Sequence, residues 1–360
     1  MKNYSIIVLI ALMLFSCTPK PNAVITLWIG GYTGDDSQGI HTAMFDTGTG
    51  ELKDLKLAHK VENPSFLDLT DNNLWSVSAS GGGSAVSFAK QERSLTLLNE
   101  LSSDGKGACY IDYHKGMVSV ANYGSGDGVV YRVDEQGALG EKLFNFKHSG
   151  QGPNESRQTS AHAHCAIFSP DGKYLYVVDL GIDQVMGYAT SGDSIGQAFV
   201  ALQLLPGDGP RHLTFHPSKP QAFLINELSG TLVSGMIRED GRISQVDRKS
   251  SMPEGYDGHI QSADIHVSPD GQYLYATNRG HNSIVSVRIS DKGELNVLDH
   301  TSVEGDWPRN FTLTPDGAFV LVANRRTNNI TIFSRDLKTG LLTFTGNELK
   351  ISEPSCLIFE

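Results

Sequence analysis

The residues best suited to chemistry are one histidine, several arginines and one glutamate at matching places in the chain. His164, Arg211 and Arg309 each stand six residues before a proline, whereas Glu227 and Arg279 directly follow apolar, strand-like segments. An imidazole titrates near neutral pH and can therefore take and return a proton. Guanidinium groups bind anions and stabilise developing negative charge. The set indicates acid–base chemistry on an anionic substrate, provided that the fold brings these side chains together.

Each of these residues also has a structural interpretation. Arginines at strand ends often form ion pairs with neighbouring segments or are simply solvated. His162 and His164 form a His-x-His pair, which is a common arrangement of metal ligands. We expect no metal, because a third ligand signature is missing and a cluster of arginines would repel a cation. His212, next to Arg211, is expected to be structural and to bond to a neighbouring segment.

The elements that position these residues form an internal repeat. Ser169-Pro170-Asp171-Gly172 begins a stretch that returns in closely similar form at 268–278 and 314–324, with a looser copy at 216–226. The prolines at 170, 217, 269 and 315 are separated by 47, 52 and 46 residues. Each copy contains an apolar strand that ends in proline, a tight polar turn and a second apolar strand. A period of this length, with several strands per repeat and no helical pattern, is typical of β-propeller blades.

The repeat predicts an all-β protein, a seven-bladed β-propeller that occupies residues 24–360 as one domain. First strands are expected to begin near Pro64, Gly107, His164, Arg211, Ala263, Arg309 and Ser355, and second strands to end near Tyr32, Ala79, Asn122, Asp179, Asn226, Asn278 and Asn324. The segment that ends at Tyr32 has no first strand before it, and the segment that begins at Ser355 has no second strand after it. We expect these two segments to pair, because pairing closes the ring and removes free sheet edges.

Antiparallel pairing places the start of each first strand beside the end of the second strand of the same blade. The Ser-Pro-Asp-Gly turns are then expected on one face of the disc. The residues that start first strands and end second strands are expected on the opposite face, around the mouth of the central channel. This face should bring together His164, Arg211, Glu227, Arg279 and Arg309.

The segment 150–161 lies in the longest interval between second-strand ends, which is 57 residues from Asn122 to Asp179. It ends shortly before His164. Two interpretations stay open, because a loop of this kind is either a lid over the channel mouth or a passive surface loop.

The first residues are typical of an export signal with a lipidation site. The apolar run over 6–15 follows Lys2 and is too short to span a bilayer as a helix. Ser16-Cys17 resembles a bacterial lipobox, which is cleaved before Cys17 and carries the lipid on its sulfur. We expect a signal peptide at 1–16, a tether at 17–23 and an exported lipoprotein on the periplasmic side of the cell envelope, at the outer membrane. The alternative is a plain signal peptide in which the cysteine is incidental.

Composition excludes several classes of protein. Hydrophobic residues make up 39% and charged residues 19%, which is an ordinary globular mixture. The net charge of −11 argues against a nucleic-acid partner, whose phosphates require a basic surface. If Cys17 is lipidated, Cys109, Cys165 and Cys356 remain, an odd number in apolar runs far apart in the sequence. We interpret them as buried thiols and not as a disulfide framework or a metal site.

Several stretches match a known family in order along the mature chain. They are Gly31-Tyr32-Thr33, Asn122-Tyr123-Gly124-Ser125-Gly126, His164 ahead of Phe168-Ser169-Pro170-Asp171-Gly172, Gly209-Pro210-Arg211-His212-Leu213, Asn226-Glu227-Leu228, Asn278-Arg279 and Trp307-Pro308-Arg309. With these stretches the sequence resembles the seven-bladed β-propeller lactonases, which include propeller-type 6-phosphogluconolactonases and fungal carboxy-cis,cis-muconate cyclases. The resemblance implies hydrolysis of a sugar lactone, nominally 6-phosphogluconolactone to 6-phosphogluconate, without a metal or another cofactor.

The resemblance also implies roles for the residues at the mouth. His164, Glu227 and Arg279 are expected to be catalytic, and whether His164 or Glu227 is the base stays open. The residues expected to bind a small anionic sugar lactone are Arg211, Arg309, His162, Asn122 and Tyr123. We expect a monomer that contacts the membrane only through its lipid. Export conflicts with a phosphorylated cytoplasmic substrate, so the reaction class is better indicated than the substrate. The alternatives are cyclisation of a muconate-type diacid and a non-catalytic propeller that binds an anionic sugar or a protein.

Overall fold

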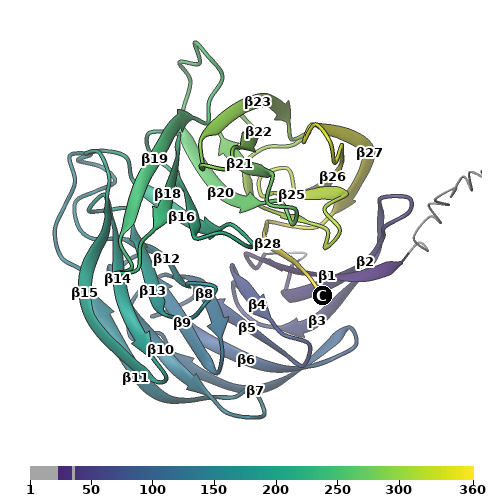
Figure 1. Ribbon diagram of the computed structural model, residues 1–360. Coiled ribbons are helices and arrows are strands. Elements are labelled where there is room, and N and C mark those ends of the chain that lie inside the picture. Colours follow the sequence, from purple (N-terminus) through teal and green to yellow (C-terminus); the bar gives the residue numbers. More distant parts are fainter. Residues whose placement is uncertain (1–22, 35–36) are drawn as a thin grey trace, which may run out of the picture.

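Seven four-stranded antiparallel sheets form a ring in the computed structural model, which describes residues 23–34 and 37–360 (Figure 1). The predicted seven-bladed β-propeller is therefore confirmed. The predicted signal peptide, Cys17 and most of the tether lie outside the described residues. Within the described part of the chain, no helix has the length and apolarity needed to cross a membrane.

Six blades consist of strands that follow one another in the sequence, and the seventh combines β28 with β1, β2 and β3. The first three strands of the chain and the last one are β1 (Val24–Gly31), β2 (Gly39–Asp46), β3 (Glu51–Lys60) and β28 (Pro354–Phe359). The next two blades are β4 (Leu67–Leu69), β5 (Asn73–Ser78), β6 (Ser84–Gln91), β7 (Ser94–Ser102), and β8 (Ala108–His114), β9 (Met117–Asn122), β10 (Asp127–Val133), β11 (Leu139–Lys147). They are followed by β12 (Ala163–Phe168), β13 (Tyr174–Asp179), β14 (Gln184–Ser191), β15 (Ser194–Gln203), and β16 (Pro210–Phe215), β17 (Gln221–Asn226), β18 (Thr231–Ile237), β19 (Ile243–Ser250). The last two complete blades are β20 (Gln261–Val267), β21 (Tyr273–Arg279), β22 (Ser283–Ile289), β23 (Leu295–Ser302), and β24 (Pro308–Leu313), β25 (Phe319–Asn324), β26 (Asn329–Arg335), β27 (Leu342–Lys350).

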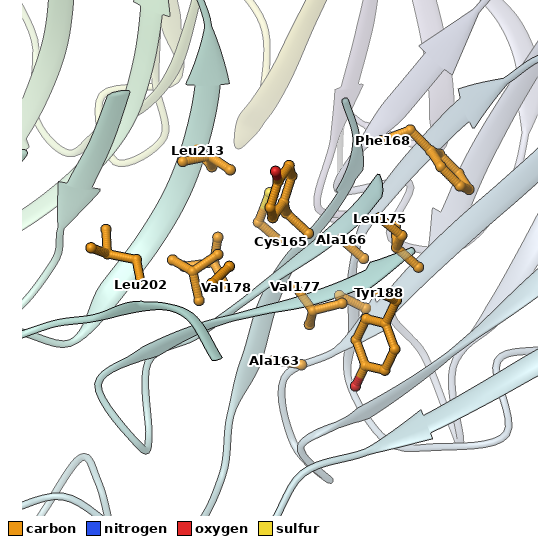
Figure 2. Close-up of a cluster of buried hydrophobic side chains, with 14 of the residues drawn as sticks. Ala163, Cys165, Ala166, Phe168, Leu175, Val177, Val178, Tyr188, Leu202 and Leu213 are labelled. Carbon is orange, nitrogen blue, oxygen red and sulfur yellow. The ribbon is translucent and has the colours of Figure 1, made fainter. Parts of the chain in front are cut away.

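The hydrophobic core lies between blades. Second strands such as β9, β17 and β21 are buried along their whole length, and their central residues are mostly apolar. Fourth strands such as β3 and β15 are largely exposed at the rim. Figure 2 shows one cluster of buried hydrophobic side chains, in which Val177 and Val178 of β13 lie with Leu202 of β15 and Leu213 of the neighbouring blade. Burial of these side chains fixes each blade against the next one.

The repeated Ser/Thr-Pro-Asp-Gly turns share one hydrogen-bond pattern. The Asp171 carboxylate accepts hydrogen bonds from the Ser169 hydroxyl at 2.7 Å and from the Lys173 amide at 3.1 Å. The copies at 268–272 and 314–318 repeat both contacts, and the glycine of every copy has a positive φ. Because these turns join first to second strands, they all lie on the same face of the ring.

The ring closes as the sequence predicted. The last strand β28 pairs with β1 in antiparallel register, with Leu27 opposite Phe359 and Ile29 opposite Leu357. Figure 1 shows the C-terminus beside β1, so one blade is assembled from both ends of the chain. No blade in the described residues is left with an unpaired innermost strand. Residues distant in sequence are thereby held at equivalent positions around one axis.

Candidate active site

A cavity of about 450 Å³ lies on the face opposite the Ser-Pro-Asp-Gly turns, where inner strands begin and second strands end. All seven blades contribute to it, as rotational equivalence predicted. Its lining residues are Tyr32, Ala79, Gly107, Ala108, Cys109, Tyr123, Gly124, Arg157, His164, Glu227, Gln261, Arg279 and Arg309. The structure therefore places His164, Glu227, Arg279, Arg309 and Tyr123 in one cavity.

Glu227 is the centre of an ion-pair network. Its Oε2 accepts a hydrogen bond from Nη2 of Arg279 at 2.7 Å and lies 3.2 Å from Nε of Arg211. Its Oε1 accepts from Nη2 of Arg157 at 2.5 Å and from Nε2 of Gln261 at 3.2 Å. Burial favours the protonated carboxyl, but Arg279 and then Arg211 outweigh it and hold the pKa of Glu227 well below its usual range. Both oxygens of the ionised carboxylate are therefore occupied.

His164 is buried and is oriented by packing. Its ring meets Tyr123 and His212 edge to face, each with a centroid separation of 5.3 Å. Nδ1 lies 4.0 Å from the Sγ atom of Cys109, and no carboxylate in the described residues forms a hydrogen bond with the ring. Burial, followed by the charge of Arg211, holds the pKa of His164 well below its usual range. The imidazole is therefore neutral at neutral pH.

Arg279 and Arg211 are both buried, but only Arg279 lines the cavity. Arg279 donates to the carbonyl oxygens of Gln261 at 3.1 Å and Ser262 at 2.9 Å besides its ion pair with Glu227. Burial lowers its pKa to about 9, which still leaves the guanidinium charged at neutral pH. Arg211 instead donates to the Ala263 carbonyl at 2.6 Å, in the neighbouring blade. Arg211 was expected to bind substrate, but in this position it stabilises Glu227 and does not line the cavity.

Arg309 is the most available cation at the mouth. Its guanidinium donates to the Tyr32 hydroxyl at 2.9 Å and lies 5.4 Å from the centre of that ring. Among the described residues, no carboxylate forms an ion pair with Arg309. An anion in the cavity would therefore meet a guanidinium whose charge is not yet neutralised.

Arg157 was not predicted, and it joins the site from outside the blade repeat. It belongs to the segment 150–161, whose interpretation as a lid or a passive loop the sequence left open. Its Nη2 contacts both Glu227 and the Tyr123 hydroxyl, the latter at 3.2 Å. Burial alone would lower its pKa, but Glu227 and Tyr123 outweigh this effect and raise it. The segment reaches over the channel mouth and adds a cation there.

Asn122 and His162 support the site without lining the cavity. Asn122 is fully buried, and its amide donates to the Ser103 carbonyl at 2.8 Å and to Asp127 at 3.0 Å. The His162 ring stacks on Tyr123 with a centroid separation of 4.5 Å, and its Nδ1 lies 2.8 Å from the Tyr123 carbonyl oxygen. In this arrangement His162 packs against Tyr123, Asn122 ties the end of β9 to its neighbours, and neither side chain lines the cavity.

The remaining predictions concern His212 and the cysteines. His212 forms a 2.7 Å contact from Nδ1 to Asp264 in the neighbouring blade, as expected for a structural residue. Cys165 and Cys356 are buried free thiols, which confirms their interpretation. Cys109 is also free but only half-buried, because it is the second residue of β8 and faces the cavity. Strand alternation alone did not reveal this exposure.

Fold and site together define a β-propeller with a cationic cavity suited to acid–base chemistry on an anionic substrate. Comparisons with known proteins agree with this class. A family model described as "Lactonase, 7-bladed beta-propeller" matches residues 26–359. The chain is 34% identical over 341 residues to the 6-phosphogluconolactonase of Bacillus subtilis, covering 92% of this chain and 97% of that protein. It is also 34% identical over 348 residues to a 6-phosphogluconolactonase of Formosa agariphila, covering 92% and 98%.

A solved structure gives the same result. The periplasmic gluconolactonase of Pseudomonas aeruginosa superposes with a TM-score of 0.89 at 29% identity, covering 94% of this chain and 99% of that one. The chain belongs to the seven-bladed β-propeller lactonase family, which confirms the resemblance seen in its motifs. It is a lactone-hydrolysing enzyme.

Proposed function

We propose that the protein hydrolyses a sugar lactone that carries an anionic group, with His164 as the general base. The observation that carries this proposal is the composition of the cavity. A neutral imidazole, one ionised carboxylate and the guanidinium groups of Arg157, Arg279 and Arg309 line the cavity. Arg211 pairs with the same carboxylate without lining the cavity. One carboxylate neutralises only one of these charges, so the site retains an excess of positive charge that favours an anion.

The first step is attack by water. A ring nitrogen of His164 takes a proton from water while the water oxygen bonds to the lactone carbonyl carbon. The carbonyl oxygen becomes an oxyanion, and Arg279, fixed by Glu227 and by two backbone carbonyls, supplies preorganised positive charge to it. The tetrahedral intermediate then collapses with cleavage of the ring C–O bond. The imidazolium returns its proton to the leaving alkoxide, which yields the hydroxy acid.

Glu227 is the positioning residue of this site and not its base. A general base must have a free acceptor atom, and both oxygens of Glu227 are engaged by arginines and Gln261. Its depressed pKa also makes it a weak proton acceptor. Arg309 and Arg157 are assigned to the anionic substituent of the substrate, because both line the cavity and retain exposed surface.

Metal independence is part of the proposal. Among residues 23–34 and 37–360, no group of three or more His, Cys, Asp or Glu side chains is placed to hold a metal ion. The cationic cavity would in addition oppose a metal. Activity should survive exhaustive treatment with a chelator, and a loss that added Mg²⁺, Ca²⁺ or Zn²⁺ restores would contradict this point.

The test of the function uses H164Q, R279A and E227Q with 6-phosphogluconolactone and D-glucono-1,5-lactone as substrates. Loss of an oxyanion donor typically lowers kcat by about 10²–10³-fold, and we expect this range for R279A. The spontaneous hydrolysis rate is measured in parallel and subtracted. Folded variants that all match the parent would disprove the catalytic assignment. Formation of a lactone from a muconate-type diacid would instead favour the cyclase alternative, and binding without turnover would favour a non-catalytic propeller.

The cellular location of the protein determines which lactones are available to it as substrates. We propose an exported lipoprotein anchored through Cys17, and the periplasmic location named for the Pseudomonas aeruginosa relative supports this. Outside the cytoplasm a neutral or non-phosphorylated sugar lactone becomes the second candidate substrate. C17A should shift the protein from the membrane fraction to the soluble fraction. Equal membrane association of the parent and C17A would disprove the anchor.

A further inference from the structure

Five blades enter their innermost strand through a residue in the left-handed backbone conformation. These residues are Asn63 (φ 46°), Gly107 (68°), Gly209 (57°), Trp307 (66°) and Glu353 (43°). The carbonyl oxygen of each accepts a hydrogen bond from the amide of the residue that follows the second strand of the same blade, over 2.7–3.2 Å. The five positions are therefore equivalent corners of the same backbone turn.

Trp307 is the one bulky side chain among these five corners. Left-handed φ is readily adopted by glycine and tolerated by asparagine, but it brings the Cβ atom of other residues close to the backbone. Glycine already occupies the equivalent corner before β8 and before β16. The backbone turn thus requires no indole, and the reason for tryptophan must lie in what its ring contacts.

The Trp307 ring contacts Arg279, the arginine assigned to the oxyanion. The guanidinium carbon of Arg279 lies 5.3 Å from the ring centre, and that of Arg326 lies 3.5 Å from it. The imidazole of His259 is parallel to the indole within 8°, at a centroid separation of 6.3 Å. A charged guanidinium over an indole face is held by a cation–π interaction, which is stronger where the pair is shielded from water. Arg279 is buried, and Trp307 is half-buried.

We propose that Trp307 is a positioning residue whose indole face holds the Arg279 guanidinium in its catalytic orientation. The hydrogen bonds to Gln261, Ser262 and Glu227 fix one edge of that guanidinium. The indole restrains its plane, so that the remaining N–H groups point into the cavity. This inference rests on the proposed role of Arg279 in lactone hydrolysis.

The test compares three substitutions at Trp307. W307F keeps an aromatic face, W307L keeps bulk and backbone strain without that face, and W307G removes bulk and strain together. We expect W307F to remain close to the parent, and W307L and W307G to lose about tenfold in kcat with little change in KM, as expected for a weakened contact to a transition-state donor. W307G relieves the left-handed corner but loses the indole contacts with Arg279 and Arg326, so its melting temperature is measured to show that the variant is folded.

Two controls separate the possible causes. E353G makes the same backbone change at an equivalent corner whose side chain pairs with Arg325 and does not contact Arg279, and it should keep the parent's kcat. R279A is measured alongside. If R279A hydrolyses the lactone like the parent, the assigned function of Arg279 fails, and this inference fails with it.

Other outcomes overturn the inference alone. In the first such outcome, R279A is inactive but W307L and W307G keep the parental kcat. In the second, W307L and W307G raise KM without lowering kcat, which would make Trp307 a substrate-binding surface. The comparison of W307F with W307L stands even where W307G does not fold, since both keep a large side chain.

Discussion

At the scale of single residues, the cavity contains two titratable groups whose surroundings push their pKa values in ways that fit different roles. His164 is kept neutral by burial and by the charge of Arg211, whereas Glu227 is kept ionised by three arginines. A neutral imidazole accepts a proton, and an ionised carboxylate with occupied oxygens orients cations. When the surroundings push the pKa values of two neighbouring groups apart, the difference is a common basis for assigning acid–base roles.

The depressed pKa of His164 predicts the pH dependence of the reaction. The neutral, active form persists above the pKa of the folded enzyme and is lost only as the pH falls through it. Because this pKa lies well below the usual histidine value of about 6.5, kcat/KM should stay constant on acidification through pH 6.5 and fall only at lower pH. The measurement is kcat/KM against pH, with spontaneous hydrolysis subtracted. An acid limb centred at or above pH 6.5 would contradict the assignment.

Cys109 gives a second prediction at this scale. Its thiol faces the cavity 4.0 Å from His164, an arrangement that invites comparison with cysteine nucleophiles. Burial, however, raises the pKa of Cys109 to about 12, so almost no thiolate exists at neutral pH. We expect C109A to retain kcat and the parent to resist iodoacetamide at pH 7. Rapid alkylation with loss of activity, prevented by lactone or product, would contradict an inert thiol.

The sequence predicted which residues reach the mouth better than it predicted what each side chain does there. Counting from the prolines placed His164, Arg211 and Arg309 at equivalent strand positions, and all three occupy them. Yet only His164 and Arg309 line the cavity. The Arg211 side chain instead pairs with Glu227 and donates to the Ala263 carbonyl. Rotational equivalence fixes the backbone, but the direction of a long side chain depends on partners in the next blade.

At the scale of elements, the segment between β11 and β12 is a strap over the mouth that is anchored by a buried side chain. Gln158 is fully buried, and its Nε2 donates to the Leu180 carbonyl and to Asp183, both at 2.8 Å. Asp183 in turn accepts the Gly209 amide at 2.8 Å, so the strap is tied to the neighbouring blade. Arg157, the residue before Gln158, is presented to the cavity by this anchor.

The position of Arg157 in the strap predicts that R157A binds an anionic lactone more weakly. Removing a charged donor from the proposed anion site should raise KM for 6-phosphogluconolactone by about tenfold or more, since hydrogen bonds to charged groups contribute roughly 1.5–3 kcal/mol. KM for the neutral D-glucono-1,5-lactone should change less. Steady-state kinetics on both substrates check this expectation.

Two further variants define the role of the strap. R132A removes an exposed arginine whose ion pairs with Glu141 and Asp193 lie outside the cavity lining, and it should leave both KM values unchanged. Q158A should reproduce the R157A defect in weaker form and lower the melting temperature, because it removes one hydrogen bond to Asp183 and leaves the buried Leu180 carbonyl without its side-chain donor. Equal KM shifts for the two lactones in R157A would contradict recognition of an anion.

Arg157 could not be found by reasoning from the repeat. Its segment has no counterpart in the other blades, so counting from a proline or a strand end assigns it no position. The length of the interval from Asn122 to Asp179 was the only signal, and it indicated a loop without naming the side chain that reaches the site. Glu227 was predicted, but the presence of a third arginine on its carboxylate follows only from the path of the strap.

At the scale of the whole molecule, ring closure was predictable because the repeat left one unmatched strand at each end. The pairing of β28 with β1 confirms that count. The positions of Arg211, Glu227, Arg279 and Arg309 in the repeat also predicted an excess of arginines at the mouth, which the net charge of the chain does not reveal because it averages over the whole surface. The chain carries a formal charge of −11, yet the ring gathers Arg157, Arg211 and Arg279 around a single glutamate and adds Arg309 to the same cavity. Circular symmetry thus concentrates positive charge in an otherwise acidic protein.

This contrast predicts a salt dependence that distinguishes the substrates. A cationic cavity in an acidic molecule attracts an anionic lactone at short range, and added salt screens the attraction, since the Debye length falls from about 30 Å at 0.01 M to about 10 Å at 0.1 M ionic strength. We expect kcat/KM for 6-phosphogluconolactone to fall several-fold over this range, whereas that for D-glucono-1,5-lactone stays nearly constant. R309Q should flatten the first curve, because it removes the cation without a carboxylate partner among the described residues. Parallel curves for the two lactones would show that the guanidinium groups do not recognise the phosphate and would contradict an anion site at the mouth.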